Sequence, residues 1–101
     1  PAFHYMVTRF GGAELACAPY VTFGTPALAA ACIAALGPRR ACLLANHGMI
    51  VHAKDADTVL ADAVLLETLA RQYLLARAAG TPRLLSAREI AEAVERFKDY
   101  G

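Results

Sequence analysis

The sequence predicts an α/β fold in which helices flank a small central sheet. Two apolar runs of strand length, residues 40–45 and 49–53, stand close together, and a long helical pattern follows over residues 57–79. Only the tripeptide 46–48 separates the two apolar runs. Because so short a break leaves no room for a helical crossover, we expect an antiparallel hairpin or a single bent strand.

Two short elements are expected before the first helix. A short helix or turn is predicted over residues 1–10, because Gly11 and Gly12 stop it. A brief strand is predicted over residues 14–18, because Pro19 ends it.

Capping residues mark the first long helix. Thr25 is a good N-cap and Pro26 suits the first helical position, so a helix is expected to begin there. It continues through Leu36, and Gly37 with Pro38 closes it.

The longest helix is predicted over residues 57–79. Asp55 or Asp57 caps its start, and Gly80 ends it, with Pro82 beyond. Apolar side chains cover most of its circumference and leave only a polar stripe, which includes Asp62. We therefore expect this helix to be buried on more than one side.

A capping box predicts the last helix. Ser86 is followed three residues later by Glu89, a pair that satisfies backbone N–H groups at a helix start. The helix is expected to reach about Asp99. Because 101 residues contain no repeat and no internal linker, they form one compact domain or a piece of one.

Composition favours a domain that packs against other chains. Hydrophobic residues make up 57% of the chain and charged residues 19%, below the roughly 25% that is usual for soluble domains. The net charge is +1 and the basic residues are scattered, so binding to nucleic acid or to a membrane surface through charge is not expected.

Cysteine usage and hydropathy indicate a cytoplasmic protein. Cys17, Cys32 and Cys42 show no paired spacing, so we expect reduced, buried thiols rather than disulfides or a zinc knuckle. No uninterrupted apolar run reaches the ~18 residues of a membrane span.

One polar pair interrupts the apolar run over residues 41–51. Asn46 and His47 lie in its middle, on backbone expected to be buried and rigid, and Gly48 leaves room for a group to approach the imidazole. Such a histidine is either a metal ligand or acid/base group, or a neutral core residue. The run alone favours the core residue. His52 is close in sequence, but no third zinc ligand is evident nearby.

The common catalytic motifs are absent from the sequence. Neither the GxGxxG nor the GxxxxGK[ST] spacing of phosphate-binding loops occurs, and HExxH and GxSxG are also missing. Motif spacing alone therefore assigns no reaction.

Six sequence blocks carry a resemblance to a known family. They are PAFHYM at 1–6, GG at 11–12, CAPYVTFGT at 17–25, LLANHGMIV at 43–51, RQYLL at 71–75 and LLSAREIAEAVERFKDYG at 84–101. In order and spacing they resemble the C-terminal half of class II aldolases of the L-fuculose-phosphate aldolase type, within the aldolase/adducin superfamily. Residues 18–25 and 97–101 resemble the fuculose-phosphate aldolase branch more than the epimerases or dehydratases.

The resemblance implies a fold and a reaction. The fold is a central, mainly antiparallel sheet between helical layers, of which residues 1–101 would form the C-terminal half without the N-terminal half. The reaction is the zinc-dependent cleavage of a ketose 1-phosphate, such as L-fuculose 1-phosphate, to dihydroxyacetone phosphate and a short aldehyde. The family also implies a homotetramer.

The resemblance also implies roles for individual residues. Three histidines hold the zinc in this family, and one of them precedes a Gly in the block that matches Asn46-His47-Gly48, so His47 is the implied ligand. Tyr5 and Tyr100 match tyrosines that reach a neighbouring subunit's active site, for proton transfer and for positioning the aldehyde. Zinc polarises a ketone, and a phenol can donate or accept a proton. His4 and His52 match no family ligand and are expected at the surface or in support of the site.

The remaining active-site groups of the family belong to its N-terminal half. These are two zinc histidines, the acid/base glutamate and the phosphate-binding groups, all of which would precede Pro1. One histidine is too few for a stable zinc site, so we expect the isolated chain to be inactive.

Two alternatives stay open at this point. Instead of an aldolase, the protein would then be another sugar-phosphate enzyme of the superfamily, an epimerase, dehydratase or decarboxylase, or a non-catalytic adducin-like binding module. The intact Asn46-His47-Gly48 block argues against the binding module, because adducin-like domains lose the metal ligands.

Overall fold

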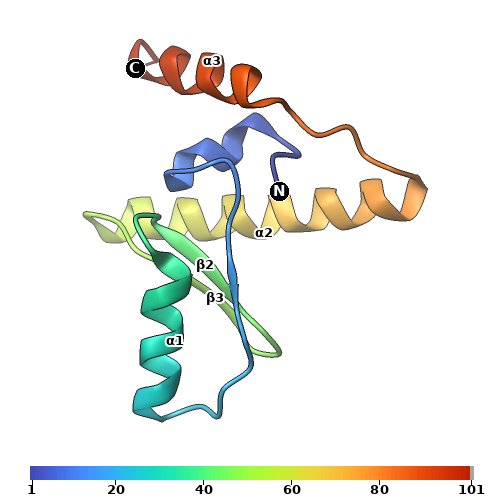
Figure 1. Cartoon of the computed structure of the whole chain (residues 1–101). Coiled ribbons are helices and arrows are strands. Elements are labelled where there is room, and N and C mark those ends of the chain that lie inside the picture. The colour runs from blue at the N-terminus through green and yellow to red at the C-terminus, as the bar shows by residue number, and fades with distance from the viewer. Residues whose placement is uncertain (101) are drawn as a thin grey trace. The chain divides into compact units, whose positions relative to one another are not determined.

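The computed structural model describes residues 1–100, so Gly101, the end of the 97–101 block, lies outside the described part. The chain divides into two units, which are described separately. The first comprises Pro1–Glu14 with Val64–Gly101, and the second comprises Leu15–Ala63. Figure 1 shows the elements in chain order, which are the 3₁₀ helix Tyr5–Phe10 (η1), β1 (Cys17–Ala18), α1 (Pro26–Leu36), β2 (Ala41–Leu44), β3 (Gly48–Val51), α2 (Ala56–Ala79) and α3 (Ala87–Lys98).

A three-stranded sheet forms the centre of the second unit. β2 and β3 pair in antiparallel fashion from Ala41 opposite Val51 to Leu44 opposite Gly48, which confirms the predicted hairpin. β1 pairs with β2 in parallel, and α1 provides the connection between them. The longer pairing is therefore antiparallel, as expected, but the sheet is mixed. β1 contains only two residues, fewer than the five predicted.

Helix α1 covers one face of this sheet (Figure 1). Its N-cap is Thr25, whose hydroxyl accepts the N–H of Leu28 at 3.2 Å, and Gly37 at φ 51° follows its last residue. Both helix ends agree with the prediction. Small residues let the helix approach the strands closely. The buried side chains of that sheet face are Ala18, Cys42 and Leu44. The partly buried helix side chains that pack on them are Ala31, Cys32, Ala35 and Leu36.

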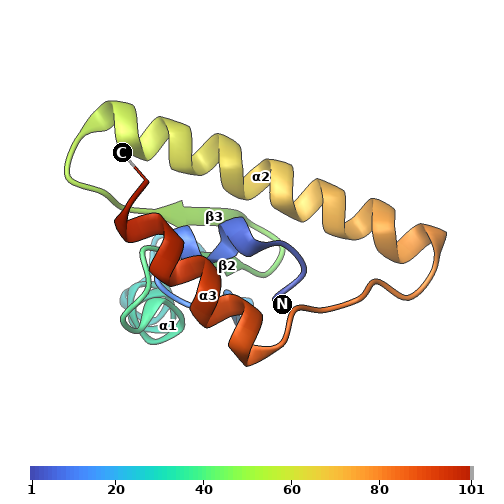
Figure 2. The ribbon, with the colours of Figure 1, turned by 90° about the horizontal axis from the view of Figure 1, so that it is seen from above.

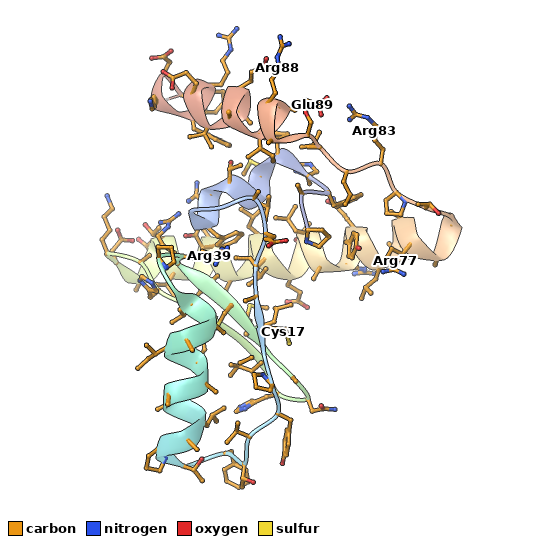
Figure 3. All side chains as sticks on the ribbon, viewed as in Figure 1. Cys17, Arg39, Arg77, Arg83, Arg88 and Glu89 are labelled. Carbon is orange, nitrogen blue, oxygen red and sulfur yellow. The ribbon has the colours of Figure 1, made fainter. Side chains whose placement is uncertain are left out.

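The three cysteines differ in burial. Cys42 is buried and Cys32 partly buried, but Cys17, labelled in Figure 3, is exposed, so the prediction of three buried thiols is wrong for that residue. All three are free thiols. Burial, followed by the hydrogen bond with Cys32, raises the pKa of the Cys42 thiol to about 11. At neutral pH Cys42 is thus protonated and acts as a small apolar core residue.

A buried ion pair joins the beginnings of β2 and α2 in the second unit. The carboxylate of Asp62 is fully buried, and its Oδ2 lies 3.5 Å from a guanidinium nitrogen of Arg40. Sequence periodicity places Asp62 in a polar stripe, where exposure is expected. The buried position is sustained because a guanidinium compensates the carboxylate charge.

Helix α2 begins directly after Asp55, which is one of the two N-caps that the sequence predicts. The Asp55 carboxylate accepts the N–H of Thr58 at 2.7 Å, and hydrogen bonds from Thr58 lower the pKa of Asp55. Burial of this helix on more than one side is not found among the described residues. Only Asp62, Leu66 and Leu69 are buried, and the large apolar side chains that it exposes are Leu60, Val64, Leu74 and Leu75. None of the helices within residues 1–100 is both long and apolar enough to cross a membrane.

The first unit brings the chain's beginning against α3. Figure 2 shows α3 alongside η1, and the N–H of Leu85 donates to the carbonyl of Ala2 at 2.7 Å. η1 buries Val7 and Phe10 and ends at Gly11, whose φ of 92° stops the helix as predicted.

The predicted capping box is present at the start of α3. Glu89 accepts the N–H of Ser86 at 2.8 Å, and Ser86 Oγ accepts the N–H of Glu89 at 3.2 Å. The guanidinium of Arg83 donates to the same carboxylate, and Arg83 and Glu89 are labelled in Figure 3. The Ser86 N–H, then Arg83, then the Ser86 hydroxyl lower the pKa of Glu89 to about 2.

We expect the capping box to make the unfolding free energy sensitive to acid. Because the pKa of Glu89 is lower in the folded state, its stabilising effect is present above the unfolded pKa of about 4.3 and is lost as pH falls toward 2. Urea unfolding from pH ~5 to ~2 should therefore show a smaller loss of stability for Glu89→Gln than for the wild type. Glu92→Gln, which alters an exposed ion pair with Arg88, is the control. Identical pH dependence of Glu89→Gln and wild type would contradict this account.

Candidate active site

His47 lies in the turn of the β2–β3 hairpin. Asn46 adopts φ 56°, a left-handed conformation that Asn tolerates better than most residues, and this reverses the chain. The N–H of His47 donates to the carbonyl of Leu44 at 3.1 Å and closes the turn. The side chain of His47 is exposed. The predicted buried, strand-borne position is therefore wrong, and so is the core-histidine interpretation that the apolar run favoured.

The turn is nevertheless held rigidly. On its N-terminal side the N–H of Ala45 donates to Ala18 at 3.0 Å, which extends the parallel pairing with β1 to the edge of the turn. On its C-terminal side Gly48 pairs with Leu44 in β3. The His47 backbone is thus fixed by two strands while its imidazole points to an open surface.

Gly48 leaves space beside His47, as the sequence predicts. Its φ is not positive, so the backbone does not require glycine, and a Cβ added there would meet no atom of the described chain within 4 Å. By contrast, Gly24 and Gly37 have positive φ, which explains them locally. The packing of residues 1–100 gives no reason for glycine at position 48, which is consistent with a group from elsewhere approaching the imidazole.

Tyr5 opens η1, and its ring is in contact with other rings. The imidazole of His4 is stacked on it with centroids 4.7 Å apart and planes at 25°, and Phe97 of α3 lies 6.1 Å away at 30°. The hydroxyl of Thr8 donates to the Tyr5 carbonyl at 2.8 Å. The Tyr5 side chain is 50% exposed, so its outer part remains available to a ligand.

Tyr100 lies just beyond the C-terminal end of α3. Its N–H donates to Phe97 at 3.3 Å, and its ring meets that of Phe97 edge to face, with centroids 6.5 Å apart. It is 84% exposed. The structure thus brings Tyr5 and Tyr100 together through Phe97. Sequence reasoning did not single out Phe97, although its spacing of three residues from Tyr100 at a helix end was a usable indication.

The other histidines hold backbone groups. His4 Nδ1 accepts the N–H of Met6 at 3.1 Å, which makes it the N-cap of η1. His52 places Nε2 3.2 Å from the carbonyl oxygen of Arg39. His52 is exposed at the surface, and His4 is partly buried against Tyr5, so the first has the predicted surface position and the second the predicted supporting one. His47 belongs to the second unit, and the two tyrosines belong to the first.

No cluster of three His, Cys, Asp or Glu side chains suited to a metal ion occurs within residues 1–100. His47 fits a single ligand position, since it is an exposed imidazole on fixed backbone with space beside it. A zinc site needs three or four ligands, so the others would have to come from outside the described residues.

Comparison with known proteins identifies the family. The model of the family described as "Class II Aldolase and Adducin N-terminal domain" matches residues 1–74. The chain belongs to this family. Among solved structures, an L-fuculose 1-phosphate aldolase superposes on 97% of this chain and 46% of its own length, with a TM-score of 0.90 and 37% sequence identity. The predicted fold class, an incomplete part of the class II aldolase fold, is confirmed.

Relatives with assigned activities match the chain along its whole length. The 5-methylthioribulose-1-phosphate/5-deoxyribulose-1-phosphate aldolase of Rhodospirillum rubrum is 43% identical over 101 residues, and the L-fuculose phosphate aldolase of Escherichia coli K12 is 43% identical over 102. The chain covers 46% and 47% of those two proteins, so it spans about half the length of the curated relatives it matches. The matched part is their C-terminal portion, as the resemblance predicted.

Proposed function

We propose that the protein carrying this chain is a class II aldolase, a carbon–carbon lyase that cleaves a ketose 1-phosphate to dihydroxyacetone phosphate and a short aldehyde. The observation that carries the proposal is the match to aldolases along the entire chain, with the His47-Gly48 turn intact. Residues 1–101 then contribute one metal ligand and two tyrosines to a site completed by other groups. The isolated chain is accordingly inactive.

The substrate proposal is a ketose 1-phosphate of the L-fuculose 1-phosphate type. A specific observation favours a second candidate, 5-methylthioribulose or 5-deoxyribulose 1-phosphate, because relatives named for these substrates and for L-fuculose phosphate are equally similar to the chain, at 43% identity. All of these names describe phosphorylated ketoses, and the reaction class is shared between them. Assays with both substrates distinguish the two candidates.

His47 is proposed to hold the zinc together with ligands from outside this chain. A bound zinc ion would supply a Lewis acid for the substrate carbonyl. The contribution of the chain is positional, because the strand pairing on both sides of the turn fixes the imidazole. A neutral imidazole ligand adds no negative charge, so the net charge of the metal with this ligand stays positive. Space beside Gly48 admits the substrate or the remaining ligands.

Tyr5 and Tyr100 are proposed to transfer a proton and to position the aldehyde part of the substrate. A phenol hydroxyl donates or accepts a proton at an oxygen within hydrogen-bond reach. Their rings share a contact with Phe97, and each leaves half or more of its side chain exposed. This shared contact supports the proposal that both phenols serve one substrate molecule.

The assembly is proposed to be a cytoplasmic homotetramer in which the two tyrosines complete a neighbouring subunit's site. The exposed apolar side chains of α2 and the exposed tyrosines are the support for this proposal, because isolated domains seldom leave such groups uncovered. The epimerase, dehydratase, decarboxylase and adducin-like alternatives receive no support from the named relatives, which are aldolases.

We expect His47 and Tyr100 variants of the full-length protein to fail in different ways. His47→Ala removes a zinc ligand, so zinc content and turnover should both be lost while the fold persists. Tyr100→Phe removes only a hydroxyl, so turnover should fall ~10²- to 10⁴-fold with zinc retained. Elemental analysis and steady-state kinetics measure both. His52→Ala, which removes an exposed imidazole elsewhere, is the control and should match the wild type. Wild-type turnover in Tyr100→Phe would reduce that residue to an interface contact.

Mixing of inactive variants tests whether sites are shared between subunits. Full-length His47→Ala and Tyr5→Phe proteins, each shown to be impaired and able to exchange subunits, should regain part of the activity when combined. Hybrid interfaces then carry an intact His47 on one subunit and an intact Tyr5 on the next. Sedimentation of a fully active wild type as a monomer would contradict the proposed assembly.

A further inference from the structure

The feature that carries this inference is the double contact of His4. Its backbone is extended, with φ −138° and ψ 138°, and its Nδ1 accepts the N–H of Met6 as the N-cap of η1. The same ring is stacked on Tyr5 with centroids 4.7 Å apart. One side chain therefore fixes both the start of the helix and the face on which the Tyr5 phenol rests.

The hydrogen bond determines how the imidazole is oriented. Because Nδ1 accepts a hydrogen bond, it carries no proton in this arrangement, and Nε2 carries the ring N–H. Rotation of the ring about its bonds would break the cap. The plane on which Tyr5 is stacked is therefore tied to the backbone, whereas an ordinary aromatic neighbour would be held by packing alone.

A row of neighbouring rings connects His4 to α2. Phe3 lies 6.4 Å from His4 and 5.5 Å from Tyr73 of α2, and the Arg77 guanidinium lies 6.0 Å from the Tyr73 ring centroid. All of these residues belong to the first unit. His4 is thus the member that joins this row, anchored on α2, to the Tyr5 ring. Arg77 is labelled near the end of α2 in Figure 3.

Histidine is an unusual residue at the N-cap of a helix. Asn, Asp, Ser and Thr are the usual N-caps, and each would supply the acceptor for Met6. None of them has a ring to place against Tyr5. Histidine is a side chain that offers a cap acceptor and an aromatic face together.

We propose that His4 is a positioning residue for Tyr5, because its cap hydrogen bond orients the imidazole and the imidazole in turn orients the phenol. The inference rests on the proposed function only in that Tyr5 is taken to act on the substrate. Thr8, which donates to the Tyr5 carbonyl, fixes the backbone, and His4 fixes the ring. Small errors in the position of a reacting group are costly to turnover, which gives such a contact a kinetic consequence.

The test compares three His4 variants of the full-length protein. His4→Asn keeps a cap acceptor without a ring, His4→Phe keeps a ring without an acceptor, and His4→Ala removes both. 3-Fluorotyrosine placed at position 5 reports the ring environment by ¹⁹F NMR, and steady-state kinetics report kcat and KM. The matched control is His52→Ala, which removes an exposed imidazole of the second unit whose Nε2 lies 3.2 Å from the Arg39 carbonyl oxygen.

We expect His4→Ala and His4→Asn to shift and broaden the ¹⁹F signal and to lower kcat about 10-fold, with KM changed less than about 2-fold. His4→Phe should recover part of both effects, and His52→Ala should change neither. In a Tyr5→Phe background, His4→Ala should cause no further loss of kcat, because its effect passes through the missing hydroxyl.

Two results would overturn the proposal. One is an unchanged ¹⁹F signal with wild-type kcat in His4→Ala or in His4→Asn. The other is an equal loss of kcat for His4→Ala in the wild-type and Tyr5→Phe backgrounds, which would assign His4 a role independent of Tyr5. Wild-type turnover in Tyr5→Phe alone would instead refute the proposed role of Tyr5, and the ¹⁹F signal would still decide whether His4 orients the ring.

Discussion

The parallel pairing between β1 and β2 is the constraint on which the candidate metal ligand depends. It runs from Cys17 opposite Leu43 to the hydrogen bond between Ala45 and Ala18, so β1 holds β2 up to the first residue of the turn. From there Asn46 reverses the chain into β3. The backbone that carries the His47 imidazole is thus hydrogen-bonded into strands on both sides of the turn, which positions the ring as a metal ligand requires.

The sequence predicted the elements whose boundaries depend on local chemistry. Thr25, Asp55 and Ser86 each cap a helix, as their side-chain acceptors predict, and the short break around Asn46 predicted the hairpin. Local patterns could not predict burial, because burial depends on neighbours distant in sequence. For this reason an apolar run suggested a buried His47, which is in fact exposed. In the same way, periodicity placed Asp62 on the polar stripe of its helix, but its carboxylate is buried and paired with Arg40.

The two parts of the candidate site differ in how they were found. The resemblance implied roles for Tyr5 and Tyr100, whereas only the structure shows their ring contacts. Tyr5 contacts the rings of His4 and Phe97, and Tyr100 contacts that of Phe97. Helix α2 exposes large apolar side chains, and such groups are seldom left uncovered, so α2 offers a surface for packing against further protein.

The most direct test of this account is whether the His47 ring nitrogen binds metal in the full-length protein. Long-range ¹H–¹⁵N correlation spectra of ¹⁵N-histidine-labelled protein report each imidazole, and the His47→Asn and His52→Asn variants assign the two signals. Addition of one equivalent of zinc to the metal-free protein should move the His47 ring nitrogens to the pattern of a metal-bound imidazole and leave those of His52 unchanged. A His47 ring that keeps the same pattern while the protein takes up zinc and becomes active would contradict the account.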